Sequence, residues 1–237
     1  MRFEVTQIKS MIVNAYLLTG EHVALVDTLD GMGYGKIQKA LRGKGLEVPD
    51  VEFILITHHH SDHAKNAAKI KRLSGATLIA GAQDAPVIEG TELNPSPSHI
   101  NRLGRFMDKL PRSLLESYQS YERVGVDRKA ADGELIQELG LEVIAVPGHT
   151  SGGVCFLDRE GRRAFIGDMV SYFRGKPGMP SLSFSEGLDK IKTSQELLAG
   201  LGLDIAYPGH GNIIQPDASR KIADFVEEQK AKGAYGS

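Results

Sequence analysis

Apolar and polar residues alternate along the first part of the chain. The runs at 3–8, 11–18 and 23–26 have the two-residue period and the β-branched content of strands, and a tight polar break and Gly20-Glu21 separate them. Because the connections are so short, the three runs predict an antiparallel meander.

Strand and helix patterns then follow one another to the end of the chain. Helical spacing of apolar residues marks the helices, and short β-rich runs mark the strands. The expected elements are a helix at 34–41, a strand at 51–56, a helix from 62 to the glycine at 75, strands at 76–80, 141–146, 153–157 and 164–166, a helix around 188–198, a strand at 205–207 and a helix from 217 to about 232.

The segment at about 86–131, called the flap below, has a different character. Prolines 95, 97 and 111 bound a helix expected at about 98–110, and a less regular stretch is expected after it. Strands and helices recur on both sides of the flap, so we expect one domain over 1–237 with a sheet in each half and helices outside. This α/β (α+β) arrangement is a four-layer αββα sandwich with a helical insertion.

Composition narrows the choice of partners and compartment. The 237 residues are 41% apolar with a formal charge of −2, which gives no overall attraction for nucleic acid or anionic membrane. A single cysteine excludes an internal disulfide, and the N-terminus reads as a strand rather than as a signal segment. No apolar run reaches the roughly 20 residues of a membrane helix. We therefore expect a cytoplasmic protein that acts on a small molecule.

Metal-capable side chains gather directly after the strand expected at 51–56. The sequence THHHSDH at 57–63 contains His58, His60, Asp62 and His63 in the loop before a helix. Farther along, His149 in VPGHTSGG, Asp168 in FIGDMV and His210 in YPGHGN each follow an apolar strand, and tight glycine turns there can aim side chains at a shared point.

Five histidines and two aspartates at strand ends suit zinc or another borderline divalent metal. Each histidine alone could also be a turn or core residue, but spacing, loop context and order would then have to coincide by chance. Because a single catalytic zinc needs about three protein ligands, seven candidates favour two metal ions. Zinc is expected, with iron or manganese as alternatives.

These motifs resemble the five-motif signature of the metallo-β-lactamase-fold superfamily, from Asp27 in LVDT to His210. The resemblance implies the αββα fold and a hydroxide between two metals that attacks a carbonyl or phosphoryl centre. It also implies the ligand sets: His58, His60 and His149 for one metal, Asp62, His63 and His210 for the other, with Asp168 bridging them.

Two residues are candidates for catalysis beyond metal binding. Asp62 could orient the attacking water or shuttle its proton. Tyr172, four positions after Asp168, could donate a hydrogen bond to a developing oxyanion, as a tyrosine from this loop does in some carbonyl-hydrolysing relatives; the alternative is a packed tyrosine.

Other polar residues near the motifs have weaker assignments. Asp27, Thr57 and Thr150 could hold the imidazoles by hydrogen bonds or could be ordinary turn residues. Cys155 lies in a strand and is expected to be a buried small hydrophobe. No chemistry is assigned to His22, His59 and His99.

The resemblance leaves the substrate open. Zinc β-lactamases commonly have cysteine where Asp168 stands, and glyoxalase II favours glycines where this chain has Ala64-Lys65-Asn66. The leading interpretation is hydrolysis of a small carbonyl ester, lactone or thioester, with the flap over the pocket. A phosphodiesterase or nuclease, an iron-dependent oxidative enzyme and a non-enzymatic metal-binding scaffold are the alternatives.

The flap also bears on assembly. It carries Phe106, Met107, Leu110 and Leu114, which would suit a homodimer if exposed, although such residues more often pack inward.

Overall fold

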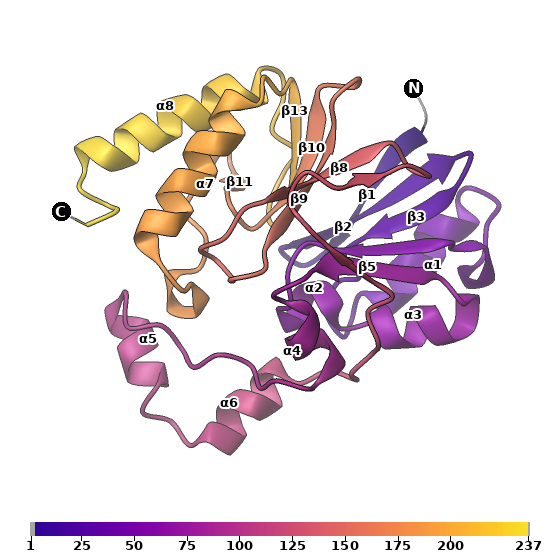
Figure 1. Cartoon of the computed structure of the whole chain (residues 1–237), viewed down its shortest axis with the longest axis horizontal. Coiled ribbons are helices and arrows are strands. Elements are labelled where there is room, and N and C mark those ends of the chain that lie inside the picture. Colours follow the sequence, from indigo (N-terminus) through magenta and orange to yellow (C-terminus); the bar gives the residue numbers. More distant parts are fainter. Residues whose placement is uncertain (1–2, 237) are drawn as a thin grey trace.

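Two β-sheets lie face to face, with helices on both outer surfaces (Figure 1). The computed structural model describes residues 3–236, so residues 1–2 and 237 of the predicted domain lie outside it. The first sheet has the order β1 (Phe3–Ser10), β2 (Val13–Gly20), β3 (Val23–Val26), β4 (Phe53–Ile56), β5 (Thr77–Gly81), β6 (Arg128–Ala130). The second has the order β13 (Ile205–Pro208), β10 (Arg163–Gly167), β9 (Val154–Asp158), β8 (Leu141–Ala145), β7 (Leu135–Ile136).

Helices cover the outer faces of both sheets. Helices α1 (Tyr34–Arg42) and α3 (Ala67–Ser74) pack on the first sheet, and α7 (Leu188–Gly200) and α8 (Ala218–Ala231) lie on the second (Figure 1). A small hairpin, β11 (Ser171–Phe173) with β12 (Lys176–Gly178), stands apart from both sheets. The predicted four-layer αββα sandwich is therefore confirmed.

Side chains that alternate along the strands build three apolar layers, one between each two adjacent layers of the αββα sandwich. In β2, Leu17 faces the layer under α1 and α3, whereas Tyr16 and Leu18 face the space between the sheets. In β9, Phe156 lies between the sheets and Cys155 lies under α7 and α8. Cys155 is a fully buried free thiol, as predicted.

The helix expected from 62 to 75 is interrupted. It forms α2 (Ser61–Ala64) and α3, with a break at Lys65 and Asn66. The Asn66 side chain donates to the backbone oxygens of Thr28 and Asp30 at 2.7 and 2.8 Å. These bonds fix a non-helical φ of −101° at Asn66, so the chain turns before α3 begins.

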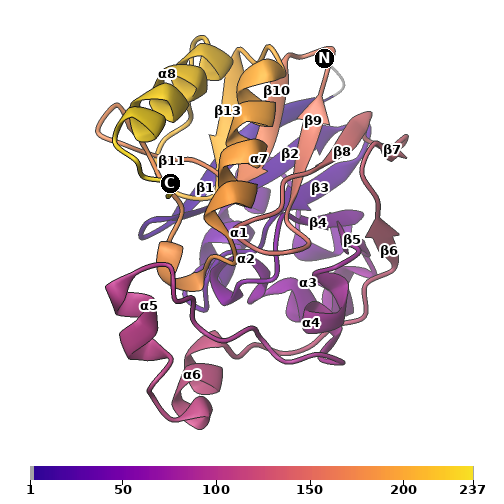
Figure 2. The same cartoon turned by 60° about the vertical axis from the view of Figure 1, so that its left-hand side comes forward.

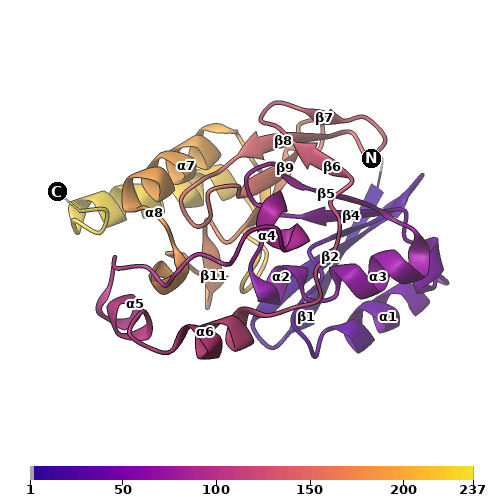
Figure 3. The ribbon, with the colours of Figure 1, turned by 60° about the horizontal axis from the view of Figure 1, so that its bottom comes forward.

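The flap contains α4 (Ala85–Glu89) at its start, α5 (Arg102–Met107) and α6 (Arg112–Gln119), and its last residues form β6. Helices α5 and α6 project away from the sheets (Figures 2 and 3). The helix expected at 98–110 is shorter than predicted because the Asn101 side chain caps it, accepting the Gly104 N–H at 2.7 Å. The stretch expected to be less regular forms α6, which begins directly after Pro111.

Two apolar side chains of the flap differ from the expectation that they pack inward. Phe106 is 63% exposed and Leu114 is 56% exposed. Helices this short have too few neighbouring residues to cover both faces. Among the described residues, none of the helices is both long and apolar enough to cross a bilayer.

Candidate metal centre

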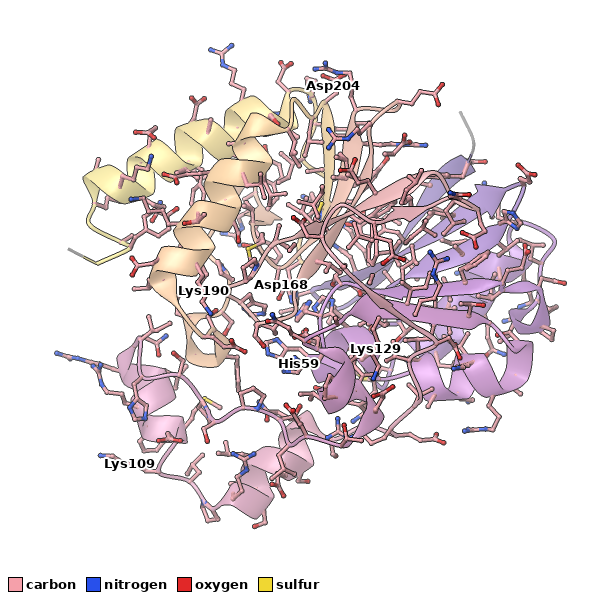
Figure 4. The ribbon with its side chains drawn as sticks, in the orientation of Figure 1. His59, Lys109, Lys129, Asp168, Lys190 and Asp204 are labelled. Atoms are coloured by element: carbon pink, nitrogen blue, oxygen red, sulfur yellow. The ribbon has the colours of Figure 1, made fainter. Side chains whose placement is uncertain are left out.

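The ends of five strands meet at one edge of the sandwich. Strands β3, β4 and β5 are parallel, and β10 is parallel to β13, so the carboxyl ends of each set lie together. The loops after β4, β8, β10 and β13 carry the predicted ligands. Figure 4 shows Asp168 at this edge, which faces α5 and α6.

Asp168 lies at the centre of a cluster of imidazoles. Its Oδ1 is 3.3 Å from Nε2 of His63, and its Oδ2 is 3.1 Å from Nε2 of His210. The Nε2 atoms of His149 and His58 lie 3.4 and 4.0 Å from the same Oδ2. A carboxylate that faces four imidazoles has the position that a bridging ligand requires.

The cluster divides into overlapping groups of metal-capable atoms. Within each group the ligand atoms lie no more than 4.8 Å apart, a spacing at which one cation could contact all three. Together the groups contain all seven predicted ligands: His58, His60 and His149; His58, His63 and Asp168; Asp62, His63 and His210.

The unpartnered atoms of the cluster fit divalent cations. The Nε2 atoms of His58, His63 and His149 and the Oδ1 atom of Asp168 are buried without a hydrogen-bond partner among the described residues. Buried polar atoms normally have partners, because leaving them unpaired is costly. Imidazole nitrogens and a carboxylate oxygen aimed at a common point are the ligands that zinc takes.

The charges of the cluster's own side chains lead to the same conclusion. Burial opposes protonation of His63 and His210, but the carboxylates around them, Asp168 foremost and Asp62 with it, together outweigh burial and raise the pKa of His63 well above its usual value and that of His210 to about 10. Burial lowers the pKa of His58 and His60 well below the ordinary value. The carboxylates therefore attract positive charge to this point, and cations would replace the protons.

Hydrogen bonds behind the cluster fix the rings from the first sheet. Asp27 accepts from the Thr57 N–H and from the Thr57 hydroxyl, both at 2.8 Å, and its Oδ2 is 2.9 Å from Nδ1 of His63. The Thr57 hydroxyl also lies 3.0 Å from Nδ1 of His58. Engaging Nδ1 leaves Nε2 free as a ligand, and of the two interpretations of Asp27 and Thr57 the geometry agrees with hydrogen-bond support of the imidazoles.

The rings of the second half are held in the same way by partners that the sequence did not reveal. Nδ1 of His149 is 2.9 Å from the Ser185 hydroxyl, and Nδ1 of His210 donates to the carbonyl of Ile12 at 3.1 Å. Both contacts join segments that are far apart in the chain, and no motif marks them.

Asp84 joins two of the ligand-bearing loops and was not singled out from the sequence. This residue, 1% exposed, accepts from the N–H of His59 at 2.9 Å, the Thr150 hydroxyl at 2.8 Å and the N–H of Gly152 at 2.7 Å. Nδ1 of His59 lies 3.2 Å from the same carboxylate. Thr150 therefore supports Asp84 rather than an imidazole, and His59 lies outside the groups of ligand atoms.

Glycine is required directly before His149 and directly before His210, for a different physical reason at each position. A Cβ at Gly209 would lie 2.1 Å from Oδ1 of Asp168, so only glycine lets this strand end approach the cluster. Gly148 has a φ of 126°, which side-chain-bearing residues rarely adopt.

A pocket of about 570 Å³ opens at the cluster. Asp62 lies on its border and is partly exposed, so it can contact both the cluster and a bound molecule. Much of the remaining lining is apolar: Ile12, Phe173, Met179, Pro180 and Phe184.

Tyr172 does not face this pocket. Its strand neighbours Ser171 and Phe173 line the pocket, whereas Tyr172 packs against the apolar layer under α7 and α8. Successive side chains of a strand point to opposite faces. The geometry therefore gives no support to the predicted oxyanion contact and agrees with a packed tyrosine.

The chain matches the model of the metallo-beta-lactamase superfamily over residues 9–210, and it therefore belongs to that superfamily. A probable metallo-hydrolase of Methanocaldococcus jannaschii is 24% identical over 202 residues, which are 84% of this chain and 88% of that protein. The predicted metal-dependent hydrolase is thereby confirmed at the level of the superfamily.

Two further comparisons concern fold and length. The crystal structure of a metallo-beta-lactamase family protein from Thermus thermophilus has a TM-score of 0.77 at 24% identity, covering 98% of this chain and 80% of that one. An atrochrysone carboxyl ACP thioesterase of Aspergillus fumigatus is 25% identical over 227 residues, which are 92% of this chain. The chain spans only about half the length of this thioesterase and of two lactamase-like relatives: the matched residues cover 54–56% of those proteins.

Proposed function

We propose that the protein is a dinuclear metal hydrolase that cleaves a small-molecule carbonyl ester, lactone or thioester. The observation that carries the proposal is the convergence of all seven ligand residues, with unpartnered buried atoms, at the mouth of a largely apolar pocket. The thioesterase from Aspergillus fumigatus supports the carbonyl chemistry by similarity.

The ligand assignment follows the groups in the cluster. His58, His60 and His149 would hold one cation, Asp62, His63 and His210 the other, and Asp168 would lie between them. Zinc suits this set of imidazoles and carboxylates, and iron or manganese are the alternatives. Two such cations would lower the pKa of water toward neutrality and polarise the carbonyl group of the substrate.

The side chains around the pocket position the reactants. The neighbouring imidazoles of His63 and His210 outweigh burial and keep the pKa of Asp62 well below its usual value. Asp62 is therefore an ionised carboxylate that can accept a hydrogen bond from water and orient it. The apolar wall, which includes Phe173 and Phe184, would hold the hydrocarbon part of a substrate and exclude water from it.

A phosphodiester is the second candidate because the same pair of cations suits a phosphoryl centre. The apolar wall favours the carbonyl substrate over a charged phosphodiester, and the pocket lining contains only one lysine and no arginine among its described residues.

The test compares zinc-loaded protein on p-nitrophenyl butyrate and on bis-p-nitrophenyl phosphate, with bound metal measured by mass spectrometry. We expect turnover of the ester, loss of turnover and of metal in His60→Ala, and neither loss in the control His22→Ala, since His22 lies in the bend before β3, beside Glu52 and outside the pocket lining. Turnover of the phosphate alone would transfer the proposal to phosphodiesters, and iron bound in preference to zinc, with no turnover of either compound, would favour oxidative chemistry.

A further inference from the structure

Lys65 faces the pocket from the end of α2. It follows Asp62 by three residues and Ser61 by four, and side chains with this spacing lie on one face of a helix. All three line the pocket. The stem of Lys65 runs beside Gly31, where an added Cβ would lie 3.8 Å from its Cε, and its Nζ donates to the backbone oxygen of Ser120 in the flap.

This ammonium group lacks a counter-ion. Among the described residues, no carboxylate lies within 4.0 Å of Lys65, although many other surface lysines and arginines have such a partner. An ammonium has three N–H donors, and the Ser120 carbonyl takes one of them. A half-buried cation with unused donors at the border of a pocket is suited to an anionic group of a ligand.

Two amide side chains of the flap lie at the same pocket. Asn94 is only 5% exposed, and Gln119 is half-buried next to Ser120, the residue that Lys65 binds. Neither side-chain amide hydrogen-bonds to any other residue in the part of the chain that the structure describes, although the Asn94 carbonyl accepts from Arg112. A side chain as buried as Asn94 normally has a hydrogen-bond partner, and the half-buried Gln119 amide lines the same pocket, so both amides are available to a bound molecule.

We propose that Lys65, Asn94 and Gln119 form a carboxylate-binding subsite, so that the substrate is a carbonyl ester or thioester that itself carries a carboxylate. One ammonium and two amides match a single negative charge, whereas a phosphate dianion calls for more cations than this pocket offers. The inference rests on the proposed hydrolase function and names its substrate class.

The position of Lys65 also bounds the length of the substrate. About 5–6 Å separates Cβ atoms three residues apart on a helix, and Asp62 borders the metal cluster. The Lys65 stem, whose Nζ reaches the Ser120 carbonyl, adds to this separation, so the carboxylate of the substrate is expected several carbon atoms from the carbonyl that reacts.

The experiment uses zinc-loaded protein and two pairs of thioesters that differ only in charge. In the first pair the charge is on the acyl half: S-adipoyl-N-acetylcysteamine and its methyl ester. In the second it is on the thiol half: S-butyryl-3-mercaptopropionate and its methyl ester. The release of thiol gives kcat/KM for each compound, and the ratio of the acid to its methyl ester is the preference for charge.

Lys65→Gln removes the charge but keeps an N–H donor for the Ser120 carbonyl. We expect the wild type to prefer the acid in one pair and Lys65→Gln to lower that preference about ten- to a hundredfold, the range for a hydrogen bond to a charged group. The control is Lys69→Gln, four residues farther along the chain in α3, where the ammonium lies over the Tyr34 ring at 3.5 Å and outside the pocket lining. It should leave the preference unchanged.

Two results would overturn the subsite: no preference for the acid in either pair, or an equal loss for acid and methyl ester in Lys65→Gln, which would make the lysine a latch for the flap. If the wild type cleaves none of the four thioesters, the thioesterase activity itself fails. The subsite is then judged by the binding of ¹³C-labelled adipamate to zinc-loaded wild type and Lys65→Gln, because any contact with the metals is common to both. Weaker binding by the variant retains the subsite, and equal binding removes it.

Discussion

Replacing Asp84 by alanine should destabilise the fold and the metal centre together. The carboxylate is 1% exposed and accepts hydrogen bonds from three donors, the N–H groups of His59 and Gly152 and the hydroxyl of Thr150. Each buried donor left without a partner costs about 1–3 kcal/mol, so the loss is at least about 3 kcal/mol. That is a large share of the roughly 5–15 kcal/mol by which domains are stable.

Urea unfolding of wild type, Asp84→Ala and Asp84→Asn measures this loss by linear extrapolation. The asparagine variant keeps one acceptor oxygen and should lose less, about 2 kcal/mol. A control is Asp132→Ala, because Asp132 accepts only the N–H of Ala145 at 2.8 Å and is exposed; its loss should stay below about 1 kcal/mol.

The two ligand-bearing loops that Asp84 joins should also bind metal about 10- to 100-fold more weakly in Asp84→Ala. A loss of stability below about 1 kcal/mol, with unchanged metal affinity, would refute the reasoning that this carboxylate ties the loops together.

Removal of bound metal by a chelator should lower Tm by at least about 5 °C, because a ligand at 100 times its Kd adds about 2.7 kcal/mol to the stability of the folded state. Adding zinc back should restore the Tm. An unchanged Tm after chelation would contradict the prediction. Gly209→Ala should lose bound metal, since the added Cβ would lie 2.1 Å from Oδ1 of Asp168. The control Gly200→Ala should retain metal, because a Cβ added there meets no atom within 4 Å. Equal metal content in both variants would count against the close approach of Gly209 to Asp168. The hydrogen bond to Glu52 raises the pKa of His22, so its stabilisation is present below about pH 6.5 and is lost as the pH rises through the raised value. His22→Gln should therefore lower the urea midpoint at about pH 5.5 and leave it unchanged well above the raised pKa, and NMR titration of His22 in Glu52→Gln should show the pKa returning toward 6.5.

The strands of both sheets could be predicted because burial on two faces leaves a local pattern. Residues 53–56 and 154–158 are buried throughout, and such apolar runs between turns are visible without knowledge of the fold. The helices of the flap were less predictable, since a proline such as Pro111 is compatible with ending one helix and equally with starting the next, and only the structure shows that α5 ends earlier, at Met107, and that α6 begins after Pro111.

The metal ligands could be proposed from spacing, but the residues that support them depend on contacts between distant segments. Ser185 meets His149 across 36 residues, and Thr150 meets Asp84 across 66. A usable signal existed for Asp84, an acid three residues after a buried strand, much as Asp168 follows β10. For Tyr172 the sequence left an oxyanion contact and a packed side chain open, and only the structure shows that its strand neighbours, not Tyr172 itself, line the pocket.

The predicted ligands come from the loops that follow strands and from the short helix α2 after β4, whereas the flap supplies Asn94 and Gln119 to the pocket and none of the predicted ligands. In the proposed function, part of the substrate-binding surface is thus encoded in a different stretch of the gene from the metal ligands. A change confined to the flap between α4 and β6 could alter the substrate preference while the metal ligands stay unchanged. The scaffold that carries the metal ligands can therefore be kept while the flap is varied. A library of variants restricted to that segment is a direct way to seek new activities.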